Sequence, residues 1–366
     1  MDLTIFIITF NRPQFINLLL NFLIKKKYNS DIIIVDGSEK KFKKKNKIVI
    51  NKIKDLYRIK NNRIRYYHSE NQLEIISKLE KNIKTRFCLF TYDDDIPGKG
   101  FIDESLKFLK SNKDYVSTNG FFGTSNISFK NKKTKLRNVK FSNMKRNNIF
   151  QNTIEKRFLN FNYNEGFAYG VYRKKDFINI FRIVKTFCNS IKNPVKKVEH
   201  VISHRLMTIT FATYNLIKGK IKKFDKIMMI RINHQYNQTS NNDYFDKIGG
   251  WHVIDFHKNN SLYIEILTNE LNKIFKSLDR RTILNLIYLH VYLRASKRLP
   301  RYFYYVHKSL NNKAFSIGEK LSILINFPFY IFFRFSRLLE KFRFLNKIIF
   351  FHNNAKEISN IEKFQI

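Results

Sequence analysis

Residues 87–95 read FCLFTYDDD, an apolar run that ends in three consecutive aspartates. The apolar part, from Phe87 to Thr91, has the length and composition of a buried strand. Asp93, Asp94 and Asp95 follow at the carboxyl end of this strand, where open α/β sheets place their ligands. Adjacent carboxylates repel one another and burial raises their pKa values, so we expect a divalent cation among them.

The residue type narrows the choice of cation. Carboxylate oxygens suit Mg²⁺ or Mn²⁺, and Mg²⁺ prefers one or two carboxylates together with the phosphates of a substrate. In an extended chain Asp93 and Asp95 point the same way, so the pattern predicts that these two hold the metal. Asp94 then faces elsewhere. The alternative interpretation is a solvated acidic turn in which Asp95 caps the next helix.

Working outward from this stretch, short apolar runs alternate with segments of helical period, which is typical of βαβ units and a mainly parallel sheet. The strands predicted besides 87–91 are Leu3–Thr9, Asp31–Val35, Ile64–His68 and Tyr115–Thr118. A helix is predicted to begin near Pro13, and its apolar residues are spaced for one buried face: Phe15, Leu18, Leu19, Phe22 and Leu23. The sequence therefore predicts an α/β fold.

The pattern changes after the fifth strand. Residues 121–160 are polar and weakly periodic, and we interpret them as an insertion or loop. Order returns near residue 166, with helices predicted around Phe177–Phe181 and over Val198–Thr213, then a strand over Lys220–Ile232. After about residue 255 the pattern is helical and aromatic, which indicates a separate C-terminal helical region.

The composition of the chain indicates its partners and its cellular compartment. The 69 Lys and Arg residues exceed the 29 Asp and Glu residues, for a net charge of +40, so acidic partners are expected. The alternative is that the excess of lysine, which accompanies abundant Asn, Ile, Phe and Tyr, reflects an AT-rich coding sequence and lies on solvated faces. The two cysteines form no disulfide framework, and residues 3–10 read as a strand rather than a secretion signal, which favours the cytoplasm. Leu321–Phe333 is shorter than the roughly 20 residues of a membrane span.

Polar motifs follow the predicted strands in a characteristic order. Thr9-Phe10-Asn11-Arg12-Pro13 ends the first strand, Asp36-Gly37-Ser38 ends the second, Asn71 follows the third, and the aspartates follow the fourth. In this order and spacing they resemble the family-2 glycosyltransferases of the GT-A fold, which have a Rossmann-like sheet. The resemblance covers roughly residues 1–120.

The resemblance implies a catalytic domain over residues 1–255, with a nucleotide-binding half over 1–120 and an acceptor half over 121–255, followed by a helical region over 256–366. It implies a nucleotide-diphosphate sugar as donor, with Asp36 accepting a hydrogen bond from the nucleobase. Asp93 and Asp95 would hold Mn²⁺ or Mg²⁺ against the diphosphate. The residues expected on the cofactor side are Thr9, Asn11, Arg12, Asp36, Asn71 and Asp94.

Inverting transfer also needs a base for the acceptor hydroxyl. The family supplies it from a Glu-Asp pair at a helix start, and the nearest match is Glu199-His200, with Glu199 expected as the base, His200 next and Glu165 third. A late histidine commonly completes the metal site in these enzymes, and His234 falls at that position. His252 and His257 are poorer matches.

The resemblance further implies a saccharide or lipid-linked saccharide acceptor, in the synthesis of a bacterial surface polysaccharide. Basic and aromatic residues over 327–347 could lie on an anionic membrane surface or pack on the catalytic half, so we expect a cytoplasmic enzyme that can attach peripherally to the inner face of the membrane. One alternative is a sugar-phosphate nucleotidyltransferase, although the turn after the first strand lacks that class's glycines. The other is a basic polyanion-binding protein; the scattered basic residues and the lack of a known motif argue against nucleic acid.

Overall fold

The computed structural model describes residues 1–59, 63–69, 75–76, 78–130, 133–142, 148–161, 167–190, 196–234 and 259–296. Its strands are β1 (Leu3–Thr9), β2 (Ser30–Asp36), β3 (Ile64–His68), β4 (Phe87–Tyr92), β5 (Asp95–Pro97), β6 (Tyr115–Lys130), β7 (Lys133–Ser142), β8 (Val171–Arg173) and β9 (Lys220–Asn233). Its helices are α1 (Pro13–Lys25), α2 (Lys40–Leu56), η1 (Glu80–Asn82), α4 (Lys99–Ser111), α5 (Ile154–Asn160), η2 (Phe167–Tyr169), α6 (Lys174–Ser190), α7 (Lys196–Lys218), α10 (Asn259–Ile274) and α11 (Arg280–Ser296).

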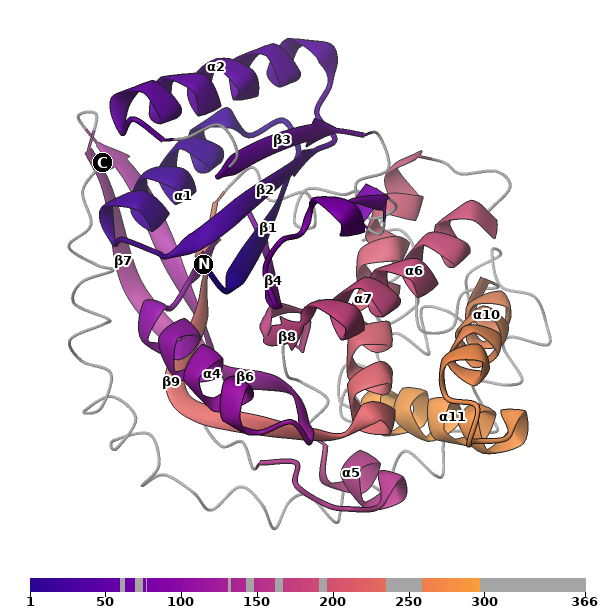
Figure 1. The fold of residues 1–366 in the computed structure, drawn as a ribbon. Helices are drawn as coiled ribbons and strands as arrows, with labels where there is room; N and C mark the ends of the chain where they lie inside the picture. The colour runs from indigo at the N-terminus through magenta and orange to yellow at the C-terminus, as the bar shows by residue number, and fades with distance from the viewer. Residues whose placement is uncertain are drawn as a thin grey trace.

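Within the described residues, the strands form one curled sheet in the order β3-β2-β1-β4-β8-β6-β9-β5, and β7 pairs with β6 (Figure 1). β1 pairs in parallel with β2 and β4, and β2 pairs in parallel with β3. Every residue of β1 is buried, as expected for a parallel strand that is covered on both faces. The prediction of an α/β fold with a mainly parallel sheet flanked by helices is confirmed.

Helices cover both faces of this parallel part. Figure 1 shows α1 and α2 on one side of β1–β3 and α6 and α7 on the other. The apolar face predicted for α1 is confirmed, because its five residues are all buried. On the other side, Phe177 of α6 packs on Phe6 of β1, with ring centroids 5.1 Å apart. The parallel part of the sheet is therefore covered by apolar side chains on both faces.

The second half of the sheet corrects one sequence-based expectation. The loop predicted over 121–160 contains most of β6, all of β7 and the helix α5. β6 pairs in parallel with β9 and in antiparallel fashion with β7 and β8. β6 is stabilised by backbone hydrogen bonds to strands on both of its sides. Such a strand can form without the alternating apolar and polar residues from which strands are predicted.

The directions of α6 and α7 follow from the strands that they connect. β8 ends at Arg173, opposite Phe87 at the start of β4, so α6 begins at the amino-terminal edge of β4. Farther along α6, Phe181 packs on Phe90 of β4, with ring centroids 5.7 Å apart. α7 ends where β9 begins, beside Tyr115 at the start of β6. The two helices run antiparallel, because Tyr214 of α7 donates to Asp176 at the start of α6 and Phe211 packs on Phe181 farther along α6.

The C-terminal part is described as far as residue 296. α10 packs against α6 and α7, and α11 packs against α5 and α7, so these helices adjoin the helical layer beside the sheet (Figure 1). Within the described ranges, no helix is long and apolar enough to span a bilayer. The boundary predicted near residue 255 and the basic aromatic segment 327–347 lie outside the described residues.

Candidate active site

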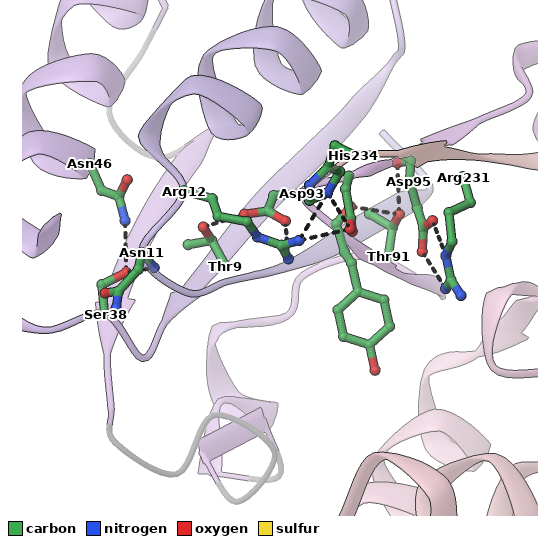
Figure 2. A network of polar contacts seen from close by, with 12 residues as sticks. Thr9, Asn11, Arg12, Ser38, Asn46, Thr91, Asp93, Asp95, Arg231 and His234 are labelled. Carbon is green, nitrogen blue, oxygen red and sulfur yellow. Dashed lines mark hydrogen bonds and ion pairs between the residues drawn. The ribbon is translucent and has the colours of Figure 1, made fainter. Parts of the chain in front are cut away.

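Asp93 and Asp94 form a turn at the carboxyl-terminal edge of the sheet, between β4 and β5, and Asp95 is the first residue of β5. The Asp93 N–H donates a hydrogen bond to the Ile8 carbonyl of β1 at 3.0 Å. The Ile232 N–H of β9 donates to the Asp94 carbonyl at 2.8 Å. Asp95 pairs with Arg231 in the antiparallel register of β5 and β9. The backbone thus fixes the turn from both sides, and β9 brings Arg231 and His234 to it (Figure 2).

Asp93 is buried between the end of β1 and the start of α1. The Thr9 hydroxyl donates to its Oδ2 at 2.6 Å, and Nη2 of Arg12 lies 2.5 Å from its Oδ1. Burial raises the pKa of Asp93 to about 7, although the nearby Arg12 guanidinium favours the ionised form. Thr9 and Arg12, two residues expected on the cofactor side, are therefore in direct contact with the aspartate turn.

Asp94 contacts two side chains from distant segments: Arg12, just before α1, and His234, just after β9. Nη1 of Arg12 donates to its Oδ2 at 2.7 Å, and Nε2 of His234 lies 3.1 Å from the same oxygen. The imidazole of His234 also packs on the ring of Phe15, with centroids 4.1 Å apart. Burial acts to raise the pKa of Asp94, but Arg12, His234 and Arg231 outweigh it and hold that pKa below its usual range.

Asp95 faces a different arginine. Nε and Nη2 of Arg231 donate to its two carboxylate oxygens at 3.0 and 3.1 Å, which is the bidentate geometry of a strong ion pair. Arg231 also donates to the hydroxyl of Tyr169, and its guanidinium lies 5.2 Å from the centre of the Phe122 ring. Burial raises the pKa of Asp95, with Arg231 acting in the opposite direction.

These contacts change the geometric argument for the metal ligands. The sequence argument assumed an extended chain, but Asp93 and Asp94 form a turn, so side chains do not alternate there. Asp93 and Asp94 share Arg12, whereas Asp95 contacts Arg231. The roles of Asp93, Asp95 and His234 as metal ligands stay a prediction, and Asp94 is the carboxylate in contact with His234.

Charged side chains surround the aspartate turn. The three buried aspartates contact two guanidinium groups, those of Arg12 and Arg231. Nη1 of Arg12 lies 2.7 Å from Oδ2 of Asp94 and 3.4 Å from Nε2 of His234, so it already places positive charge beside both atoms. Over the described ranges, no group of three or more His, Cys, Asp or Glu side chains is arranged to hold a metal ion. A divalent cation at the aspartate turn stays a prediction, in which substrate phosphates would supply the other ligands.

Asp36 lies at the same edge, at the end of β2, in a separate polar cluster. Its Oδ1 accepts a hydrogen bond from the Ser38 N–H at 2.7 Å. Its Oδ2 accepts from the Asn46 amide at 2.9 Å and from the Tyr66 hydroxyl at 2.6 Å. The Asn11 N–H donates to the Ser38 hydroxyl at 2.7 Å, which links this cluster to the turn after β1. Asp36 is fully buried, so its present contacts organise the two turns.

Asn46, Tyr66 and Arg231 were not expected in these clusters. Asn46 lies within the lysine-rich run of α2, but it precedes Ile50 and Ile53 by four and seven residues, and these three are the buried residues of that helix. Helical periodicity alone could therefore have placed Asn46 on the inner face. Arg231 carried a weaker signal: it is three residues before His234, but basic residues are common throughout this sequence.

The structure says less about the acceptor side. Glu199 and His200 belong to the first turns of α7, which begins at Lys196. Asn71, Glu165, His252 and His257 lie outside the described residues. Thr9, Arg12, the three aspartates and His234 are thus brought into one network, Asn11 and Asp36 into the neighbouring cluster, and Glu199 is placed by its helix alone.

No protein-family model matches the sequence, and no curated protein matches it. Among solved structures, S. aureus TarS 1–349 in complex with UDP-GlcNAc is 15% identical, with a TM-score of 0.46, over 90% of this chain and 92% of that one. A longer S. aureus TarS structure is 17% identical, with a TM-score of 0.43, and the match covers 88% of this chain but 55% of that one. The mannosyltransferase PcManGT from Pyrobaculum calidifontis, in complex with GDP-Man and Mn²⁺, is 9% identical, with a TM-score of 0.39, over 92% of this chain and 82% of that one.

Proposed function

We propose that this chain is a glycosyltransferase that takes a sugar from a nucleotide-diphosphate donor bound at the carboxyl-terminal edge of the sheet. One observation carries the proposal. Thr9, Arg12, the Asp93–Asp95 turn and His234 come from separate segments and meet in one buried network at the edge where open α/β sheets bind ligands. The order of these motifs along the chain resembles that of family-2 glycosyltransferases.

The donor would lie along this edge with its nucleoside toward the Asp36 cluster. The turns after β1 and β2 would hold the nucleoside, using Asn11 and Asp36, together with Asn71. A divalent cation held by His234 and the aspartate turn, with Asp94 nearest the imidazole, would neutralise the diphosphate as it leaves. Arg12 contacts both Asp93 and Asp94, so it would hold the aspartate turn in its conformation and place positive charge beside the donor.

Transfer would occur by attack of an acceptor hydroxyl on the anomeric carbon. The bond between that carbon and the diphosphate oxygen breaks, and the hydroxyl proton passes to a base, for which we propose Glu199, with His200 as the alternative. Both residues are in the first turns of α7, and the assignment rests on the resemblance of Glu199-His200 to the Glu-Asp pair of the family. We propose a saccharide or lipid-linked saccharide of a bacterial surface glycan as the acceptor.

The donor site can be tested by thermal shift with UDP, GDP, CDP, TDP and CMP, each with Mn²⁺, with Mg²⁺ and with EDTA. A ligand that binds only the native state raises its stability, by about 2.7 kcal/mol at 100 times its dissociation constant. We expect one nucleoside diphosphate to stabilise the protein and EDTA to remove the effect. Equal shifts with all nucleotides, abolished by salt, would instead identify a polyanion-binding protein.

The base is tested separately from the donor site. We expect Glu199→Gln to retain nucleotide binding while transfer falls roughly 100-fold or more, because the amide cannot accept the acceptor proton. Product formation with a purified acceptor glycan and the thermal shift above give the two readouts. The same change at Glu265 of α10, outside the proposed site, is the control. Full transfer activity in Glu199→Gln would move the base to His200 or Glu165.

A further inference from the structure

The helix α2 carries most of its charge on the side that faces away from the sheet. It contains eight lysines and a single acidic residue, Asp55. α2 packs against α1 and β3, and its buried residues are Asn46, Ile50 and Ile53. Figure 1 shows α2 at the outer margin of the molecule, beside α1. The opposite side of the helix is therefore accessible to a partner.

The exposed side of α2 has a regular arrangement. Residues spaced four apart are neighbours on one side of a helix, and positions 44, 48, 52 and 56 form such a row. This row alternates lysine with an aliphatic residue, and two further lysines lie beside it. We call the whole group the basic face, and its residues, all exposed, are Lys41, Lys44, Lys45, Ile48, Lys52 and Leu56.

The lysines of the basic face are not neutralised within the protein. Elsewhere, the surface lysines Lys99, Lys220 and Lys273 each pair with a carboxylate. No ion pair of the described residues includes a lysine of the basic face. The first turn of α2 has no acidic residue either, so its lysines oppose the positive end of the helix dipole. Charge that is locally unfavourable is expected where a partner supplies the opposite charge.

Two exposed aliphatic side chains lie among these lysines. Ile48 is 58% exposed and Leu56 is 66% exposed, and among the described residues Met1 and Phe150 are the other large apolar side chains in this class. Lysines alone suit any polyanion, but aliphatic side chains gain free energy only where the partner offers an apolar phase. An anionic phospholipid surface offers both headgroup charge and acyl chains. A nucleic-acid backbone offers only the charge.

We propose that the basic face of α2 docks on an anionic phospholipid membrane, with its lysines at the headgroups and Ile48 and Leu56 at the acyl boundary. On the inner side of the same helix, the Asn46 amide donates to Asp36. A helix with its side chains is about 10–12 Å across, so docking would hold the Asp36 cluster within roughly that distance of the headgroups. Membrane binding does not depend on the proposed function; a lipid-linked acceptor at that surface rests on it.

Co-sedimentation of the full chain with vesicles of phosphatidylglycerol and phosphatidylcholine, without nucleotide, tests the proposal. We expect Lys41→Gln/Lys44→Gln/Lys52→Gln to weaken partitioning roughly 100-fold, from about fivefold for each lysine at an anionic surface. Ile48→Gln should weaken it by roughly fivefold, since an isoleucine side chain then no longer leaves water on docking. Both variants replace exposed side chains with a residue that favours helices, so α2 should stay folded.

Matched variants control for charge and for apolar surface. Lys84→Gln/Lys107→Gln/Lys276→Gln removes the same charge from exposed positions outside α2. Phe150→Gln removes a side chain that is exposed to the same extent as Ile48. We expect both control variants to bind the vesicles nearly as well as the wild-type chain. Urea unfolding of every variant verifies that differences in binding do not come from loss of the fold.

Each outcome decides the proposal. Losses confined to the two α2 variants support it. An equal loss in the triple-lysine control would show that the vesicles sense only the net charge of +40. If the α2 lysine variant loses heparin and vesicle binding alike while Ile48→Gln binds vesicles fully, the basic face is a polyanion surface and the proposal fails. Undiminished vesicle binding by both α2 variants would also overturn it. A failed donor screen leaves these results unaffected, because no nucleotide is present.

Discussion

Asp94→Asn is expected to lower sugar transfer roughly 100-fold or more and to remove the metal dependence of nucleotide binding. Asp94 is the carboxylate whose Oδ2 lies within 3.1 Å of Nε2 of His234. An amide keeps the shape of the side chain and can still accept a hydrogen bond from Arg12. It loses the negative charge, however, so the site no longer attracts a divalent cation.

The same substitution at the flanking positions separates two assignments of the metal ligands. Nucleotide thermal shifts with Mn²⁺ and with EDTA are measured for Asp93→Asn, Asp94→Asn and Asp95→Asn. If Asp94 is a ligand, its variant shows the same nucleotide shift with and without EDTA. If Asp93 and Asp95 are the ligands, as their spacing predicts, those two variants lose the metal response and Asp94→Asn keeps it.

His234→Gln provides an independent check of the Asp94 assignment. This substitution should also weaken the effect of metal on nucleotide binding, because it removes Nε2 of His234, the atom that lies 3.1 Å from Oδ2 of Asp94. Unfolding curves of all four variants are needed beside the thermal shifts. A variant that retains its fold and its full metal-dependent nucleotide shift contradicts the role assigned to the residue it replaces.

Sequence reasoning located the strands of the first half because their patterns are local. A parallel strand that is buried on both faces is an uninterrupted apolar run, so β1 and β4 were predicted to within a residue. The polar turns after β1, β2 and β4 could be grouped because parallel strands end at one edge. The long hairpin of β6 and β7 could not, since its strands are held by backbone pairing between segments whose side chains have no clear period.

The composition of the site was harder to predict than its position. The contacts of Asp95 and Asp94 come from Arg231 and His234, which are 136 and 140 residues away in sequence. Their proximity depends on β9 pairing with β5, a short strand of three residues that no periodicity identifies. Which aspartate faces His234 depends on the turn at residues 93–94, because a turn breaks the alternation on which the sequence argument relied.

Arg12→Met is expected to lower the free energy of unfolding at pH 7 by about 3–5 kcal/mol, because it leaves buried carboxylates without their partner. Arg12 contacts both Asp93 and Asp94, and all three side chains are buried. Methionine has a similar length, so the loss reports charge more than volume. Urea unfolding measures the change, and Arg86→Met, which breaks an exposed pair with Asp2, should cost at most about 1 kcal/mol.

The pH dependence of the loss distinguishes charge from packing. The folded-state pKa of Asp93 is already raised to about 7 by burial, and removing Arg12 takes away the group that opposes this shift. A carboxyl with a raised folded-state pKa destabilises the protein as pH rises from the unfolded-state value toward the folded-state value. The deficit of Arg12→Met should therefore shrink as the pH falls from 7 toward 4, and adding Asp93→Asn and Asp94→Asn should recover much of it at pH 7. A deficit that is constant over this range, and unchanged by the added substitutions, would mean that Arg12 stabilises the fold by packing and not by its charge.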